Sequence, residues 1–130
     1  LSTLHTPGVE QTVERIVSVF PASRQNQVLV QLAGTLQAIL GQLLLPRADR
    51  KGRVLSTEVL LATLGVRNMI REGNIHMLAS AMQTGVREGM KTMDLALQEL
   101  YQQGQITWDV ALNHARNPEL FQKSRRKREE

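Results

Sequence analysis

Two glycines near the middle of the chain bound a short, strongly helical stretch, and this stretch constrains the fold more than any other feature. Between Gly65 and Gly73 the sequence is VRNMIRE, which we call the central segment. Arg67 and Arg71 are four positions apart, so they share one face of a helix. About two turns of helix are unstable alone, because nucleation costs too much. The central segment must therefore pack against other residues, and we expect both arginines to point outward, either toward a partner or as a solvated basic edge.

Length and composition narrow the class of protein. At 130 residues, 42% of them hydrophobic, the chain is long enough for one domain with a core of its own. It contains no cysteine, which excludes disulfides and thiolate metal sites and fits a reducing compartment. No apolar run approaches the roughly 20 residues of a membrane span. Because the chain begins Leu-Ser-Thr, without a methionine or a signal peptide, we expect it to be a piece of a longer protein.

The net charge of +4 comes from the C-terminal end. Residues 123–130 hold five of the 16 basic residues and two of the 12 acidic ones, which leaves 11 basic against 10 acidic residues elsewhere. A terminal charge cluster of this kind is most often a solvated tail. Aromatic residues make up only 3% of the chain, so few rings are present on which nucleic-acid bases could stack. The charge therefore does not favour nucleic-acid binding.

Apolar residues recur at helical spacing in several stretches besides the central segment. The predicted helices cover residues 9–20, 23–41, 75–82, 90–101 and 108–115. Ser23, Asn74 and Thr107 stand at helix starts as candidate caps, and Gly104 follows a helix end. These patterns predict that most of the chain is helical.

Shorter stretches have the composition of strands. Residues 1–4 resemble the end of a buried strand. Residues 43–45 and 53–63 are separated by a charged turn at 48–52, so they predict an antiparallel β-hairpin. The basic residues at its tip could bind an anion, although a solvated hairpin end is the commoner outcome.

These elements divide the chain into three parts. Residues 1–64 are predicted to form the end of an α/β unit, residues 65–122 an all-helical subdomain, and residues 123–130 a disordered tail. A hairpin cannot close a core alone, so the first part needs partners upstream.

The central segment resembles the AIRNLIREG signature of the type IV pilus retraction ATPases, the PilT group of the secretion-ATPase superfamily. The residues that carry the resemblance are Val66, Arg67, Asn68, Met69, Ile70, Arg71 and Glu72. One departure is visible, because Val66 stands where that group usually has isoleucine, preceded by Gly65 rather than alanine. Residues 1–6 resemble the family's His box, and residues 42–63 and 83–104 are similar to the same proteins in the same order. The resemblance spans nearly the whole chain.

The resemblance implies an α/β fold, the C-terminal part of a RecA-like ATPase core followed by the helical subdomain. It implies a homohexameric, magnesium-dependent motor that uses ATP to retract type IV pili and drive twitching motility. Such a motor works in the cytoplasm at the inner-membrane base of the pilus machine, peripheral to the membrane. Within it His5 would be a catalytic residue that senses the γ-phosphate, with Thr6 beside it. The central segment would contact a neighbouring subunit or the membrane platform protein.

The residues alone support a weaker statement about His5. It precedes a predicted helix start, where phosphates often bind. A lone histidine in such a place is nevertheless more often structural, and it is the His-box resemblance that favours the phosphate role.

The chain carries none of the motifs that hold a nucleotide. It contains no GxxxxGK[ST] loop and no strand that ends in a Walker-type acidic pair, whereas phosphoryl transfer needs a phosphate-binding loop, a lysine and a magnesium ligand. We therefore expect the isolated chain to be inactive and to bind neither ATP nor Mg2+ tightly. His76 and His114 have no partners at metal-ligand spacing, so we predict no metal site.

Two alternatives belong to other classes of protein. One is a helical DNA-binding regulator, although no recognition helix with base-reading residues near its start is evident. The other is a non-enzymatic adaptor built from the helical half.

Overall fold

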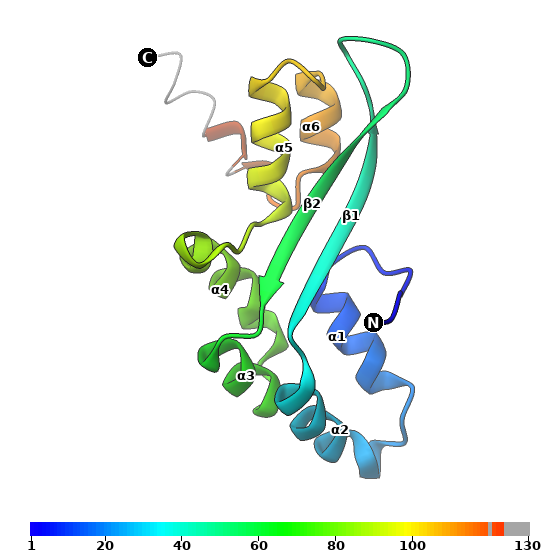
Figure 1. Ribbon diagram of the computed structural model, residues 1–130, viewed down its shortest axis with the longest axis vertical. Coiled ribbons are helices and arrows are strands. Elements are labelled where there is room, and N and C mark those ends of the chain that lie inside the picture. Colours follow the sequence, from blue (N-terminus) through cyan, green and yellow to red (C-terminus); the bar gives the residue numbers. More distant parts are fainter. Residues whose placement is uncertain (120, 124–130) are drawn as a thin grey trace. The chain divides into compact units, whose positions relative to one another are not determined.

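The computed structural model describes residues 1–119 and 121–123, and the chain forms two compact units (Figure 1). Unit 1 contains residues 1–41 and 58–91, and unit 2 contains residues 42–57 and the chain from Thr92 onward. This division differs from the predicted boundary after residue 64. The reason is that one hairpin contributes to both units, and the helix of the central segment packs into the first.

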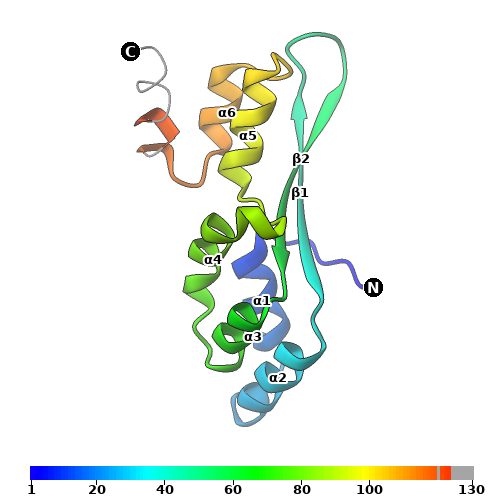
Figure 2. The same cartoon turned by 60° about the vertical axis from the view of Figure 1, so that its left-hand side comes forward.

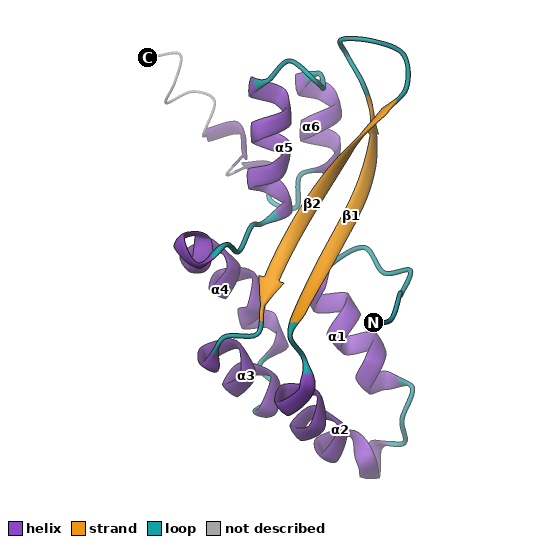
Figure 3. Cartoon of the chain, viewed as in Figure 1, coloured by secondary structure: helices purple, strands orange, loops and turns teal. Residues whose placement is uncertain are grey.

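The predicted antiparallel hairpin is confirmed. Strand β1 (Ala38–Pro46) pairs with strand β2 (Arg53–Leu61), drawn in orange in Figure 3. Backbone hydrogen bonds fix the register near the turn and near the open end: Arg47 N to the Gly52 carbonyl, and Ala62 N to the Gln37 carbonyl. Because side chains alternate between the faces of a strand, this register places Gly41 directly opposite Glu58 on one face.

The second predicted helix is shorter than expected. It ends at Thr35, whereas apolar spacing predicted helix as far as Gly41. Ile39 belongs to the strand, where it is buried between the exposed Ala38 and Leu40. An apolar residue at this position fits both a helical stripe and a strand alternation, and pairing with β2 decides between them.

Unit 1 surrounds one apolar core, and Figure 2 shows α1, α3 and α4 gathered beside the open end of the hairpin. Its helical elements are α1 (Val9–Ser18), α2 (Ala22–Thr35), α3 (Leu64–Arg71), the 3-10 turn η1 (Ile75–Met77), α4 (Leu78–Thr84) and the 3-10 turn η2 (Gly85–Glu88). All of α1 to α4 and both strands contribute buried side chains to this core. They include Val9, Val13, Ala33, Ile39, Leu60, Val66, Ile70, Leu78 and Met82.

Helix α3 contains the central segment, and its ends show why so short a helix forms. Thr63 caps it, because its hydroxyl oxygen accepts the Val66 N–H at 3.4 Å. Gly65 therefore lies inside the first turn and does not bound the helix as predicted. The C-terminal boundary at Gly73 is confirmed: its φ of 75° is left-handed, and Asn74 N donates back to the Met69 carbonyl.

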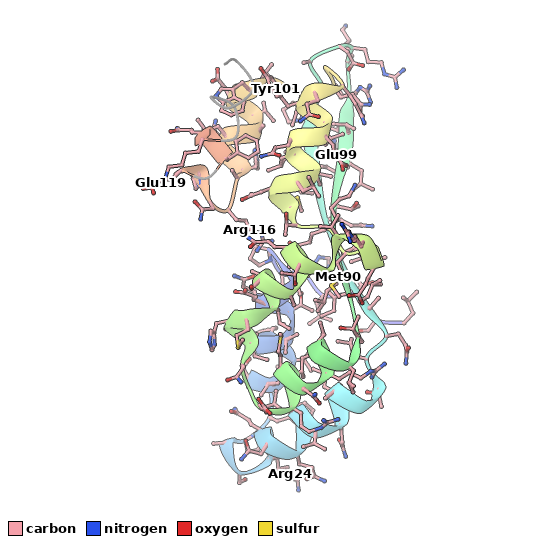
Figure 4. The ribbon with its side chains drawn as sticks, turned by 90° about the vertical axis from the view of Figure 1, so that its left-hand side faces the viewer. Arg24, Met90, Glu99, Tyr101, Arg116 and Glu119 are labelled. Carbon is pink, nitrogen blue, oxygen red and sulfur yellow. The ribbon has the colours of Figure 1, made fainter. Side chains whose placement is uncertain are left out.

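Unit 2 contains α5 (Met93–Gln102) and α6 (Trp108–His114) around a second core. Three aromatic rings pack there. The Trp108 ring lies edge-on to that of Tyr101 (labelled in Figure 4), with centroids 5.3 Å apart, and stacks on that of Phe121 at 5.0 Å. Leu45 of β1 is fully buried in the same core.

Of the four residues predicted to end or cap helices, two are confirmed and two are not. Thr107 accepts the Val110 N–H, and Gly104 has the left-handed φ expected after α5, so both are confirmed. Ser23 lies inside α2, which begins one residue earlier, and the Asn74 side chain makes no capping bond.

The predicted strand at residues 1–4 is wrong for this structure. These residues form no strand, and Leu1 is fully exposed. A strand needs a neighbour for its backbone N–H and C=O groups, and the part of the chain that the structure describes offers none at this place. Of the predicted tail 123–130, only Lys123 lies among the described residues.

None of the helices in residues 1–119 and 121–123 is long and apolar enough to cross a membrane.

Candidate functional site

His5, the predicted phosphate sensor, lies on the extended segment that leads into α1. Its side chain is exposed. In Figures 1 and 2 this N-terminal segment lies on the side of α1 that is away from α3. The structure therefore presents His5 to groups outside the unit and separates it from the central segment.

Thr6, the second predicted site residue, is tied to α1. Its hydroxyl lies 2.6 Å from the Thr12 hydroxyl. Thr12 donates its own proton to the Gly8 carbonyl at 2.7 Å, so Thr6 must be the donor in the Thr6–Thr12 bond. The Thr6 hydroxyl thus fastens the segment that carries His5 to the first turn of α1.

A buried carboxylate caps α1 from a distance. Glu58 of β2 is only 1% exposed, and its Oε1 accepts the Val9 N–H at 3.0 Å. Gly8 is the N-cap residue of α1 and has no side chain with which to make this bond. Glu58 therefore does what a local Ser, Thr, Asp or Asn does at an ordinary helix start.

Gly41 makes the room that this carboxylate needs. A Cβ atom at Gly41 would lie 2.6 Å from both Cγ and Oε1 of Glu58. The Glu58 side chain therefore crosses the space that any other residue on the opposite strand would fill, and Gly41 and Glu58 act as a pair.

This cap corrects one argument drawn from the sequence. A helix N-terminus binds phosphate through its unused N–H groups and its positive dipole end. At α1 the Val9 N–H is already donated to a carboxylate, which also brings negative charge to the same place. The α1 N-terminus is therefore a poor phosphate site, and His5 is the phosphate-binding candidate that remains in this region.

The two arginines of the central segment lie in different surroundings. Arg67 is half-buried, and its Nη1 donates to the Ala33 carbonyl in the last turn of α2 at 2.7 Å. The prediction that both arginines point outward is therefore wrong for Arg67. A guanidinium at the end of α2 satisfies a helix carbonyl and interacts favourably with the negative end of the helix dipole.

The outer face of the central segment is formed by its exposed residues. Arg71 is exposed, and its Nη1 donates to Asn68 Oδ1 at 2.8 Å. Glu72 is exposed as well and accepts a bond from Asn74 Nδ2 at 3.2 Å. Val66 and Ile70 are buried, and Met69 is partly buried against the same core. The segment therefore combines an inner apolar face with an outer polar one, as its spacing predicted.

The hairpin tip contains a salt bridge. Arg47 donates from Nε and Nη2 to the two oxygens of Asp49, at 2.8 and 2.6 Å. These hydrogen bonds hold the pKa of Asp49 below its usual value. One of the basic side chains proposed for an anion-binding loop is therefore already paired, while Arg50, Lys51 and Arg53 remain exposed.

Sequence reasoning missed the two glutamates that organise unit 1. Besides Glu58, Glu10 of α1 accepts the Ala79 N–H at the start of α4, at 3.3 Å. The only signal for Glu58 was an acidic residue inside an apolar strand, between Thr57 and Val59. Within the described residues, no three His, Cys, Asp or Glu side chains are grouped so that they could hold a metal ion.

The fold matches about a third of two solved ATPases. The solved structure of the pilus retraction motor PilT with bound ADP matches with a TM-score of 0.80 and 37% identity, over 92% of this chain and 33% of that one. The ATPase DotB from Legionella pneumophila matches with a TM-score of 0.67 and 28% identity, over 82% of this chain and 29% of that one.

Sequence comparison relates the chain to type IV pilus ATPases. A twitching motility protein from Neisseria gonorrhoeae is 47% identical over 117 residues, which are 90% of this chain and 31% of that protein. Two proteins from Pseudomonas aeruginosa also match. The type IV pilus ATPase PilU is 45% identical, over 88% of this chain and 30% of that protein. The type IV pilus retraction ATPase PilT is 38% identical, over 92% of this chain and 34% of that protein. The chain is homologous to the C-terminal portion of the pilus retraction ATPases, and it spans about a third of the length of these curated relatives.

The resemblance stated from the sequence is thereby confirmed, as is the mixed α/β fold class. No protein-family model matches the chain. The relatives give no support to the DNA-binding regulator or to the adaptor.

Proposed function

We propose that this chain is the C-terminal part of a hexameric, ATP-driven motor that powers type IV pilus retraction and twitching motility. The observation that carries the proposal is the 47% identity to a twitching motility protein across 90% of the chain. The match to a retraction motor that holds ADP supports nucleotide chemistry in the same family.

Within this motor, His5 would contact the γ-phosphate and respond to its loss. Support comes from its exposed position on the segment that leads into α1, and from the Thr6–Thr12 bond that holds this segment. Bound ATP with Mg2+ would supply the transferable phosphoryl group and the charge neutralisation that the transfer needs. On this chain His5 alone is proposed to act on the nucleotide, since Thr6 uses its hydroxyl within the fold.

The chain alone should not hydrolyse ATP or bind it tightly. It has no phosphate-binding loop, no loop lysine and no Walker-type acidic pair, so the upstream part of the full-length protein must supply the phosphate and magnesium ligands. The exposed cross-strand pair Leu44 and Leu55 on the outer face of the hairpin fits a face that this upstream part covers.

The outer face of the central segment is proposed to transmit movement to a neighbouring subunit or to the membrane platform at the cytoplasmic base of the pilus. Arg71 is the candidate contact, because it is exposed and its charge has no acidic partner among the described residues. Arg67 is better suited to holding α3 against α2, because its guanidinium is bound to the Ala33 carbonyl.

ATP turnover tests the first part of the proposal. The full-length protein should hydrolyse ATP, the 130-residue chain should not, and His5→Ala in the full-length protein should lower turnover strongly. Turnover by the isolated chain, or full turnover by the His5→Ala protein, would contradict it.

A retraction assay tests the second part. Arg71→Ala should leave ATP hydrolysis intact and abolish retraction. Arg24→Ala is the matched control, because Arg24 is also an exposed arginine and lies in the first turn of α2 (labelled in Figure 4), outside the central segment. The Arg24→Ala protein should retract normally. Normal retraction by the Arg71→Ala protein would remove the central segment from the proposal.

A further inference from the structure

The Glu58 carboxylate is an unusual choice for the place it occupies. It is 1% exposed, and removing a carboxylate from water costs far more than removing a neutral amide. A glutamine oxygen could also accept the Val9 N–H. Gly41 adds a second cost, because glycine loses more conformational freedom in a strand than any other residue. A buried carboxylate and a glycine on opposite strands thus meet at a hydrogen bond to the first residue of α1.

That bond lies four residues after His5. Between the two, Thr6 is bound to Thr12, and Thr12 is bound to the Gly8 carbonyl through both its N–H and its hydroxyl. The segment from Thr6 to the first turn of α1 is therefore internally fastened. The bond from Val9 to Glu58 attaches this segment to the sheet.

We propose that Glu58 is a positioning residue for His5, which fixes the distance and direction from the sheet at which the imidazole meets the nucleotide phosphate. This inference rests on the proposed function. The negative charge has a second effect, since it occupies the anion-attracting end of α1 and leaves His5 as the group that a phosphate meets.

Glu10 provides a matched control within the same unit. It is also a glutamate that accepts a backbone N–H at a helix start, but its partner Ala79 lies in the first turn of α4. Removing Glu10 also takes the acceptor from a backbone N–H at a helix start, and it should not move the His5 segment. A purely structural role for Glu58 predicts that neither substitution changes kcat through His5.

The experiment measures ATP turnover by the full-length protein with Glu58→Ala, Glu58→Gln and Glu10→Ala, each alone and combined with His5→Ala. Glu58→Ala should lower kcat about ten- to a hundredfold with little change in KM, because a reacting group displaced by about 1 Å loses rate of this order. Glu58→Gln keeps an acceptor and should restore most of the rate. Glu10→Ala should keep kcat within about twofold, and Glu58→Ala should have little further effect once His5 is gone, because two groups that act through one another are not additive.

The outcomes separate the inference from the function on which it rests. If His5→Ala leaves turnover unchanged, the proposed role of His5 fails, whatever Glu58 does. If His5→Ala lowers turnover but Glu58→Ala does not, or lowers it by the same factor in both backgrounds, the positioning role is overturned. Should Glu58→Ala not yield folded protein, Gly41→Ala replaces it, because it keeps the carboxylate and pushes it off the Val9 N–H.

Discussion

Replacing Gly41 with alanine should destabilise unit 1 by displacing a side chain on the opposite strand. The new Cβ would lie 2.6 Å from Cγ and Oε1 of Glu58, whereas ordinary contact begins at 3.4 Å. The carboxylate must therefore move by about 0.8 Å. Its bond to the Val9 N–H is 3.0 Å long, and a shift of this size away from Val9 takes it outside hydrogen-bonding distance.

The size of the effect follows from what is lost and gained. A buried hydrogen bond to a charged group contributes about 1.5–3 kcal/mol. Alanine in place of a strand glycine returns about 0.5–1 kcal/mol of conformational entropy. Gly41→Ala should therefore lower the free energy of unfolding by about 1–2 kcal/mol. Glu58→Ala should cost about 2–4 kcal/mol, since it leaves a buried N–H unsatisfied and opens a cavity.

The double variant, Gly41→Ala with Glu58→Ala, tests whether the two effects arise from the same contact. With Glu58 replaced by alanine, the atoms that a Cβ at position 41 would approach most closely are gone, so Gly41→Ala should become neutral or slightly stabilising. The cycle should give a coupling of about 1–2 kcal/mol in urea unfolding, with hydrogen exchange of the Val9 amide as the local probe. Additive effects within about 0.5 kcal/mol would refute the reasoning. Gly34→Ala is the control, because a Cβ there meets nothing and an exposed helix gains about 1 kcal/mol.

Three further predictions concern separate places in the fold. Arg67→Met should lower stability by about 1–3 kcal/mol in urea unfolding, because the Ala33 carbonyl loses a charged donor. Arg47→Gln should raise the pKa of Asp49 in an NMR titration, because the hydrogen bonds from Arg47 lower it. In the unaltered protein the Arg47–Asp49 pair stabilises the hairpin tip fully at a pH above the ordinary pKa of an aspartate. This contribution should disappear as the pH falls through the lowered pKa of Asp49. Phe121→Ala should lower the free energy of unfolding by about 3–5 kcal/mol and change the fluorescence of the single tryptophan, because a fully buried ring stacked on it is removed.

Local patterns predicted the elements of the fold well. Spacing and caps located the hairpin, the helix of the central segment and its end at Gly73, because these depend on residues close in sequence. The helix predicted through Ile39 failed at the point where local evidence is ambiguous. There the pairing with β2, more than ten residues further along the chain, determines the structure.

The candidate site shows the same limit more clearly. Sequence patterns pointed to His5 and to the central segment, but they could not show that Arg67 turns inward to the end of α2. Nor could they connect Glu58 with Val9, because a contact across 49 positions leaves no periodic signal. The sequence showed only that Gly41 and Glu58 lie among apolar strand residues. A glycine or a glutamate in such a place usually has another explanation.

The distance along the chain between Val9 and Glu58 also bears on the order of folding. Synthesis completes α1 first, but the acceptor for its first N–H is added 49 residues later, after the whole of α2 and β1. Until then α1 has no capping side chain, since Gly8 provides none, and a ten-residue helix is marginal by itself. The His5 segment is therefore made well before the strand whose carboxylate caps α1. A nascent chain that stops before β2 should leave it open to proteases, and one that includes β2 should protect it.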